Sequence, residues 1–198
     1  MTERRPTLCV IAGPNGSGKT TTTVQLLNNE WAADSLYINP DDIAQKIFGD
    51  WNAPEAVLKA AEQATSLRYQ YLEEQRDFVF ETVFSSPEKL EFFHKAKAKG
   101  FFIRFFYVCT SDPTINVARI TQRYMNGGHE VPISKIITRY YKSLVNAEEA
   151  LSFVDRAYVY DNSIDNQLPR LLFRTRDGNL FKRYTDDVPD WAKALIEI

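Results

Sequence analysis

The pattern of apolar and polar positions predicts short strands separated by helices. Residues 8–12 form a continuous apolar run followed by a glycine-rich turn, which is typical of a strand buried on both faces of a parallel sheet. Residues 54–76 instead carry apolar side chains at helical spacing. On the same criteria, further strands are predicted at residues 35–39, 78–80, 102–108 and 157–160. Further helices are predicted from Lys19, over 43–48, from Pro87 to Gly100, from about 113 to 124, and after Pro132.

The last part of the chain carries a hairpin signal. Asp177-Gly178, a dipeptide that favours two-residue turns, lies between the apolar runs 171–173 and 180–184, and a short helix follows. Because strands separated by helices build βαβ units, we expect an α/β fold with a mostly parallel central sheet and a C-terminal β-hairpin. With 198 residues and no repeat or linker, the chain is expected to form one domain over residues 1–198.

Composition and charge narrow the class of protein. Hydrophobic residues make up 44% of the chain and charged residues 25%, the balance of an ordinary globular protein. No apolar run approaches the roughly 20 residues that cross a bilayer, and residues 1–7 lack the features of a signal peptide, so we expect a cytoplasmic protein without a membrane partner. A net charge of −2 and the lack of a clear basic stripe argue against nucleic acid as a partner. Cys9 and Cys109, far apart in apolar stretches, are predicted to be buried free thiols.

The first glycine-rich turn carries the most specific motif in the chain. Gly13, four further residues, and then Gly18-Lys19-Thr20 match the phosphate-binding loop called Walker A, between a predicted strand and a predicted helix. Backbone N–H groups there wrap phosphates, and the helix N-terminus favours their negative charge. Lys19 is expected to reach the β- and γ-phosphates of ATP, and the Thr20 hydroxyl to hold Mg²⁺. The predicted nucleotide site comprises Gly13, Pro14, Asn15, Gly16, Ser17, Gly18, Lys19, Thr20 and Thr21.

Two groups of carboxylates follow predicted strands and should face the Walker A loop across the crevice of the sheet. Asp41 and Asp42 follow the second strand, where a carboxylate can accept a proton from a substrate hydroxyl, and Asp41 is the preferred base. Either residue is equally well placed to cap the helix over 43–48. Glu81, with Thr82, ends the third strand and is predicted to bind substrate hydroxyls or water on Mg²⁺, unless it is a plain exposed strand end.

A third group of residues has the pattern of a lid. Arg119 and Arg123 lie one helical turn apart, a Gly127-Gly128 break follows, and Arg139 lies on the next predicted helix. Arginines beside a glycine-hinged loop can close over phosphates and stabilise the charge that develops in transfer, although solvated helix faces would show the same spacing. We predict Arg123 as a catalytic residue with Lys19 and Asp41. The predicted substrate-binding residues are Asp42, Glu81, Thr82, Arg119, His129 and Arg139.

Taken together, these segments resemble the zeta toxin family of P-loop kinases. The resemblance implies a P-loop NTPase-type three-layer sandwich, nucleoside-kinase-like, and an ATP-dependent kinase that phosphorylates a sugar hydroxyl of UDP-N-acetylglucosamine. It also implies a toxin whose separate antitoxin protein restrains it. Asp41 matches the family's base, Glu81 its sugar-contacting glutamate, and Arg123 the first of its lid arginines. Where the family has a second arginine this chain has His129, a titratable group, and Arg139 is the candidate to compensate.

Three alternatives stay open at this point. A nucleoside, nucleotide or antibiotic kinase would use the same scaffold, because pocket contacts and not the phosphate-binding loop decide the acceptor. An ATP-gated binding switch would use the nucleotide to order the loop at Gly127-Gly128 for a partner protein. Phosphorylation of nucleic-acid ends is a third, which the acidic charge disfavours. The small-molecule hydroxyl acceptor itself is not specified by these patterns.

Overall fold

A single twisted sheet forms the centre of the molecule in the computed structural model, which describes residues 4–27, 35–48, 53–128 and 131–196. The strand order is β2-β3-β1-β4-β5-β6-β7. The first five strands in this order are parallel to one another, and β6 and β7 are each antiparallel to the strand before them. The strands are β1 (Thr7–Ala12), β2 (Leu36–Ile38), β3 (Phe78–Thr82), β4 (Phe102–Cys109), β5 (Arg156–Asp161), β6 (Arg170–Arg176) and β7 (Asn179–Arg183).

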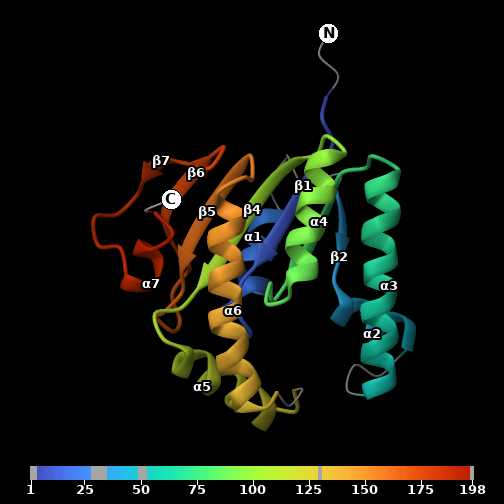
Figure 1. The fold of residues 1–198 in the computed structure, drawn as a ribbon. Coiled ribbons are helices and arrows are strands. Elements are labelled where there is room, and N and C mark those ends of the chain that lie inside the picture. Colours follow the sequence, from blue (N-terminus) through green and yellow to red (C-terminus); the bar gives the residue numbers. More distant parts are fainter. Residues whose placement is uncertain (1–3, 28–34, 49–52, 129–130, 197–198) are drawn as a thin grey trace.

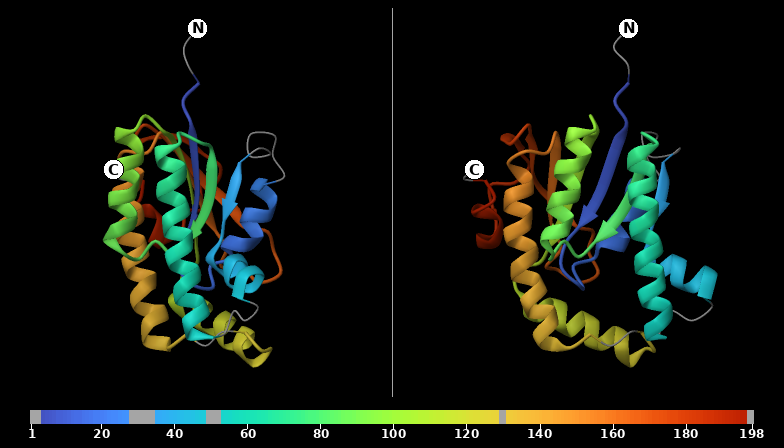
Figure 2. Two further views of the ribbon diagram at one scale, coloured as in Figure 1. Left: turned by 90° about the vertical axis from the view of Figure 1, so that its right-hand side faces the viewer. Right: turned by 45° about the vertical axis from the view of Figure 1, so that its right-hand side comes forward.

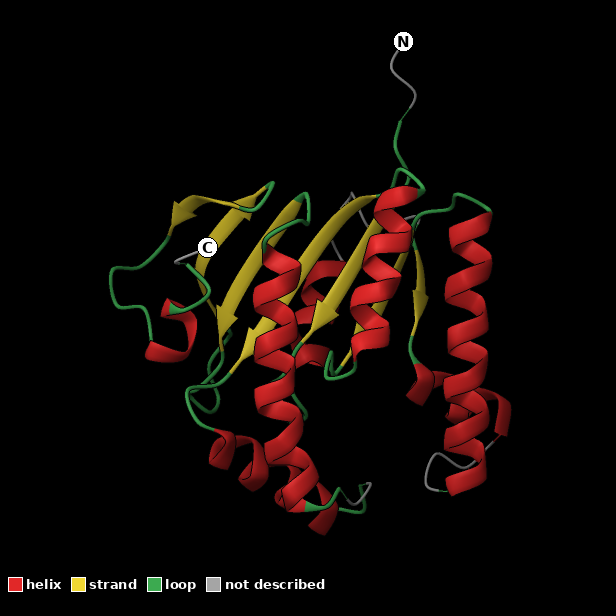
Figure 3. Cartoon of the chain, in the orientation of Figure 1, coloured by secondary structure: helices red, strands yellow, loops and turns green. Residues whose placement is uncertain are grey.

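Helices cover both faces of this sheet and make three layers. The helices are α1 (Lys19–Leu27), α2 (Pro40–Phe48), α3 (Pro54–Glu73), α4 (Pro87–Ala98), α5 (Pro113–Met125), α6 (Ile133–Leu151) and α7 (Asp190–Lys193). Figure 1 shows α4 and α6 in front of the sheet, α3 beside β2, and α1 behind. The larger core lies on the α3–α4–α6 side, and a smaller cluster lies on the α1 side. The predicted α/β fold with a mostly parallel sheet and a C-terminal hairpin is therefore confirmed (Figure 3).

The parallel part of the sheet positions everything that follows. β1 lies in the middle, between β3 and β4, and five of its six residues are buried, as its apolar run predicted. Because β1, β2 and β3 are parallel, the turns after them meet at one edge of the sheet. The amino-terminal half of α6 and all of α5 extend beyond that edge, as Figure 2 shows from two further sides.

One predicted boundary is wrong. α2 begins at Pro40 and not at residue 43, because Asn39 caps it: the Asn39 side-chain oxygen accepts a hydrogen bond of 3.0 Å from the Asp41 backbone nitrogen. Proline suits the first helical position, where its missing N–H costs nothing. Asp41 and Asp42 therefore lie inside the first turn, and neither is the cap that the sequence left open.

The predicted C-terminal turn and the predicted buried cysteines are both confirmed. Asp177 and Gly178 have φ values of 48° and 77°, and these positive angles form the turn between β6 and β7. Cys9 and Cys109 are buried free thiols, and burial raises the pKa of each to about 12. Among the described residues, no helix is long and apolar enough to cross a membrane.

Candidate active site

The loop after β1 is packed closely against neighbouring segments of the chain. Gly13, Gly16 and Gly18 have φ values of 151°, 77° and 92°, and the chain enters α1 at Lys19. A Cβ atom on Gly13 would lie 2.0 Å from the backbone oxygen of Val108 in β4. One on Gly18 would lie 2.1 Å from a side-chain nitrogen of Asn162. Glycine is therefore required at these positions by close approach as well as by backbone angle.

Replacing Gly13 by alanine should destabilise the protein far more than a positive φ alone explains. We expect a loss of about 3–5 kcal/mol in the free energy of unfolding, because backbone strain and an overlap with immobile backbone act together. Gly100 is the matched control: its φ is 83°, and a Cβ atom added there would have no other atom within 4 Å. Gly100→Ala should cost only about 1–2 kcal/mol. Urea unfolding measures both, and equal losses would contradict the close-approach argument.

Two asparagines outside the loop hold its backbone in place. Asn116 of α5 donates to the Asn15 carbonyl at 2.5 Å, and Asn162, after β5, donates to the Ser17 carbonyl at 2.8 Å. The Ser17 hydroxyl is fully buried and has no hydrogen-bond partner among the described residues. A loop that is fixed from outside and keeps a buried hydroxyl unused is organised to receive polar atoms of a ligand.

Lys19 folds back over the loop that it follows. Its Nζ donates hydrogen bonds of 2.9 Å to the carbonyls of both Gly13 and Pro14. Burial lowers the pKa of Lys19 to about 8, Glu81 partly opposes that shift, and Arg123 adds to it. A lysine that is costly to keep charged in this setting gains most from an anion beside it.

Nucleotide binding should therefore take up protons. Near pH 8 about half of the ligand-free protein carries neutral Lys19, and the phosphates of ATP raise its pKa again, so saturation should bind about half a proton. The uptake should vanish below about pH 7, where Lys19 is already charged. Calorimetry in two buffers of different ionisation enthalpy measures it. Lys19→Met, saturated with ATP, should show none, and proton release by the wild type would contradict the assignment.

Glu81 lies at the centre of a hydrogen-bond network beneath the loop. Its carboxylate accepts from the hydroxyls of Thr23 at 2.6 Å, Tyr37 at 2.7 Å and Thr20 at 3.5 Å. Asn39 donates to the Tyr37 oxygen at 3.0 Å. The pKa of Tyr37 is raised by burial and by Glu81, which keeps the phenol protonated as a donor. The network ties β2, β3 and α1 together and aims a carboxylate at Thr20.

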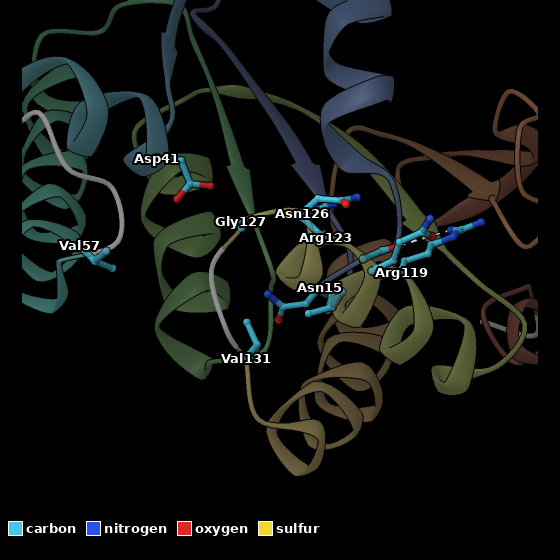
Figure 4. Close-up of a pocket in the computed structure, with 12 residues that line it drawn as sticks. Asn15, Asp41, Val57, Arg119, Arg123, Asn126, Gly127 and Val131 are labelled. Atoms are coloured by element: carbon cyan, nitrogen blue, oxygen red, sulfur yellow. Dashed lines mark hydrogen bonds between the residues drawn. The ribbon is translucent and has the colours of Figure 1, made fainter.

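Asp41 differs from its neighbour in where its side chain lies. Asp41 is exposed and lines a cavity that also contains Lys19, whereas Asp42 lines neither of the two cavities described below. Figure 4 shows Asp41 from α2, Asn15 from the loop and Arg123 from α5 around one hollow. Of the two candidate bases, only Asp41 faces the loop.

The predicted lid residues divide into two groups. Arg123, in the last turn of α5, is exposed and lines the same cavities as Asp41. Arg139 donates to the Asn15 side chain at 3.3 Å, while Arg119 donates to Asp165 at 2.6 and 2.8 Å and to the Gly16 carbonyl at 3.3 Å. Arg119 therefore braces the loop. His129 lies outside the described residues.

Two cavities of about 570 Å³ each meet at this place. The first, here called the acceptor cavity, has Lys19, Asp41 and Arg123 along its lining. The second, the lid cavity, runs beneath α5 and shares four residues with the first: Asn15, Gly16, Asp41 and Arg123. The predicted residues that line at least one cavity are Asn15, Gly16, Lys19, Thr20, Asp41, Glu81, Thr82, Arg119, Arg123 and Arg139. Exposed Thr21, at the start of α1, lines neither.

Several site residues have no signal in a motif. Thr23 and Tyr37, which hold Glu81, belong to a helix and a strand whose pairing only the fold defines. Arg68 lies in the acceptor cavity, 4% exposed, with its guanidinium 5.1 Å from the Phe80 ring centre. A usable signal existed for Arg68, because it is the one charged residue in the buried stripe of α3, which comprises Ala56, Ala60, Ala64, Arg68 and Leu72.

The fold and this site together define an ATP-dependent kinase of the P-loop class. The β2-β3-β1-β4-β5 sheet places the phosphate-binding loop, a carboxylate and arginines around one cavity. A family model, "Zeta toxin", matches residues 1–170. The chain therefore belongs to the zeta toxin family, as the sequence resemblance indicated.

Known proteins are similar to this chain in sequence or in fold. An uncharacterised protein of Haemophilus influenzae is 30% identical over 128 residues, which are 65% of this chain and 88% of that protein. A structure of the PezAT toxin-antitoxin system of Streptococcus pneumoniae matches with a TM-score of 0.63 at 16% identity, over 100% of this chain and 80% of that one. A structure of AvrRxo1-ORF1:-ORF2 with ATP matches with a TM-score of 0.70 at 12% identity, over 98% of this chain and 64% of that one. At these identities the two structures show a shared fold.

Proposed function

We propose that the chain transfers the γ-phosphoryl group of ATP to a hydroxyl group of a small metabolite bound in the acceptor cavity. One observation carries the proposal. Lys19 and Thr20 of α1, Asp41 of α2, Glu81 of β3 and Arg123 of α5 come from four different elements, and all of them line that single cavity. Positioning and electrostatic stabilisation supply most of the catalysis in phosphoryl transfer, and this arrangement provides groups for both.

Each of these residues has a role that its surroundings support. Asp41, exposed at the start of α2, accepts the proton of the attacking hydroxyl. Lys19 leaves the carbonyls of Gly13 and Pro14 to contact the phosphates, and the buried Ser17 hydroxyl gains a partner there. Arg123, which is exposed and lines both cavities, contributes a positive charge to the transferred group.

The oxygen atoms near Thr20 fit a magnesium ion. The Thr20 hydroxyl and a Glu81 carboxylate oxygen are 3.5 Å apart, and both are hard oxygen donors of the kind that Mg²⁺ prefers. Bound there, Mg²⁺ would neutralise charge on the transferred group. In this proposal Glu81 helps to bind Mg²⁺ and does not bind the acceptor's hydroxyls, because three hydroxyls of the protein already hold its carboxylate beside Thr20.

The acceptor is proposed to be a nucleotide sugar similar to UDP-N-acetylglucosamine. This choice rests on the family, and the polar lining of the acceptor cavity, with Thr65, Ser85 and Ser86, is compatible with a sugar. A toxin role with a separate antitoxin is part of the same proposal, because the PezAT neighbour comes from a toxin-antitoxin system.

The deciding experiment measures ADP formation with Mg²⁺ across UDP-sugars, nucleosides and small alcohols, for the wild type and for Lys19→Ala. Acceptor-dependent ADP formation that Lys19→Ala loses supports the proposal and names the acceptor class. Tight ATP binding without turnover on any acceptor would overturn it and favour a nucleotide-gated binding switch.

A further inference from the structure

A second group of charged residues lines the acceptor cavity, apart from those assigned to phosphoryl transfer. Arg68 of α3 and Lys89 of α4 belong to it, together with Glu88 in the first turn of α4 and with Ser85 and Ser86 just before that helix. The residues assigned to transfer come instead from α1, α2, β3 and α5. The second group therefore reaches the cavity from two other helices, and its five residues are here called the α3–α4 end.

Arg68 is a buried charge whose hydrogen-bonding capacity is largely unused. Among the described residues its guanidinium donates one hydrogen bond, of 2.8 Å to the Thr65 hydroxyl. Its Nη2 lies 4.0 Å from a Glu88 carboxylate oxygen, too far for a hydrogen bond. A guanidinium carries five N–H donors, and burying it is costly unless those donors find acceptors. Because Arg68 lines the cavity, a ligand there can supply them.

Glu88 marks a position where an anion meets both cations. The same carboxylate oxygen lies 3.0 Å from Nζ of Lys89 and 4.0 Å from Nη2 of Arg68. The Glu88 side chain is 51% exposed, whereas those of Arg68 and Lys89 are 5% and 16% exposed. A half-exposed carboxylate gains little from such a contact and can turn into solvent, which leaves its position to an oxygen atom of a ligand.

The electrostatics of this end favour a bound anion. Burial lowers the pKa of Arg68 and of Lys89, and Glu88 opposes the shift in both. The charge of Arg68 lowers the pKa of Lys89 further. Two cations that are withdrawn from water side by side are both stabilised by a negative group placed between them.

The loop that carries the two serines is fixed in advance. Asn146 of α6 donates to the carbonyls of Phe84 and Ser86 at 2.9 and 3.3 Å. Phe84 is fully buried and has a φ of 59°, a strained angle for a bulky residue and one that is frequent at ligand sites. Ser86 precedes the first turn of α4, yet its side chain forms no capping hydrogen bond. Its hydroxyl can therefore donate to a ligand.

We propose that the α3–α4 end binds a phosphate group of the acceptor. Arg68 and Lys89 supply the positive charge, and Ser85 and Ser86 supply hydroxyl donors. The inference rests on the proposed kinase reaction and narrows its acceptor to molecules that carry a phosphate ester or a diphosphate besides the hydroxyl that is phosphorylated. A neutral nucleoside or alcohol would leave the buried guanidinium with its N–H groups unused.

Turnover of three matched acceptors tests this subsite within the reaction. N-acetylglucosamine, its 1-phosphate and UDP-N-acetylglucosamine share one sugar and differ in phosphate content. The wild type should favour the two phosphorylated sugars over the neutral one by about tenfold or more in kcat/KM. Arg68→Met should remove that preference, and Arg68→Lys should restore part of it. Lys95→Gln is the matched control, because Lys95 lies on α4 but lines neither cavity, and it should keep the wild-type preference.

Binding of inorganic phosphate separates this inference from the kinase reaction. Equilibrium dialysis with radiolabelled phosphate, with Mg²⁺ and a non-hydrolysable ATP analogue filling the P-loop, should show saturable binding to the wild type and to Lys95→Gln. Arg68→Met should lose it. Glu88→Gln removes the competing carboxylate and should bind phosphate about threefold more tightly or better. A purely structural role of Arg68 would not make the Glu88 variant bind more tightly.

The two measurements fail in different ways. No saturable phosphate binding by the wild type, equal binding by Arg68→Met, or weaker binding by Glu88→Gln would overturn the inference even if turnover is found. Phosphate binding that depends on Arg68, without turnover on any acceptor, would support the phosphate subsite and count against the kinase reaction. If thermal unfolding shows that Arg68→Met is not folded, Lys89→Gln takes its place, with the same expected loss of phosphate binding.

Discussion

Asp41→Asn is expected to lower kcat by about 10²–10⁴-fold while ATP binds with wild-type affinity. Asparagine has nearly the same shape as aspartate but cannot accept the proton of an attacking hydroxyl. The Asp41 side chain is exposed and its backbone nitrogen already bonds Asn39, so the start of α2 should not change. Single-turnover ADP formation, with ATP affinity measured in parallel by calorimetry, separates the chemical step from binding.

Asp42→Asn is the matched control for this variant. Asp42 lies one residue further along the same helical turn and lines neither cavity, so its loss should change kcat by less than about threefold. The reverse pattern, with a large loss in Asp42→Asn and a small one in Asp41→Asn, would move the base to Asp42. Equal small effects in both variants would remove general-base catalysis by α2 from the mechanism.

What could be predicted from the sequence was local in the chain. The phosphate-binding loop occupies eight consecutive residues, 13–20, so its motif needed no knowledge of the fold. The alternation of strands and helices followed from periodicity, and the carboxyl-edge position of Glu81 followed from the apolar strand before it. The start of α2 was missed although Asn39-Pro40 carries both a cap and a first-turn signal, because the two aspartates after it compete for the same role.

What could not be predicted depends on register and on partners distant in sequence. Tyr37 and Glu81 meet because β2 and β3 pair, and no local pattern fixes which residues of two strands become neighbours. Arg119 and Arg123 share a helix and a spacing, yet Arg119 is held by Asp165, 46 residues away. Their spacing alone gives the two arginines the same signal, and only the family resemblance put Arg123 first. The fold adds the physical difference, because Arg119 braces the loop and Arg123 lines the acceptor cavity.

That difference predicts unequal effects for the two arginines. Arg123→Ala should lower kcat by about 10³-fold or more, the scale of a lost arginine finger, with little change in stability because Arg123 is exposed. Arg119→Ala should mainly raise the KM for ATP, because Arg119 supports the Gly16 carbonyl and does not line the acceptor cavity.

Arg123→Lys tells charge from geometry. A lysine keeps the positive charge but not the planar fork that can hold two phosphate oxygens, so it should recover only part of the loss in kcat. Steady-state kinetics with the best acceptor measures all three variants, and thermal unfolding confirms that each is folded. Turnover by Arg123→Ala within threefold of the wild type would show that Arg123 is a solvated helix end and that the lid contributes no charge to the transfer.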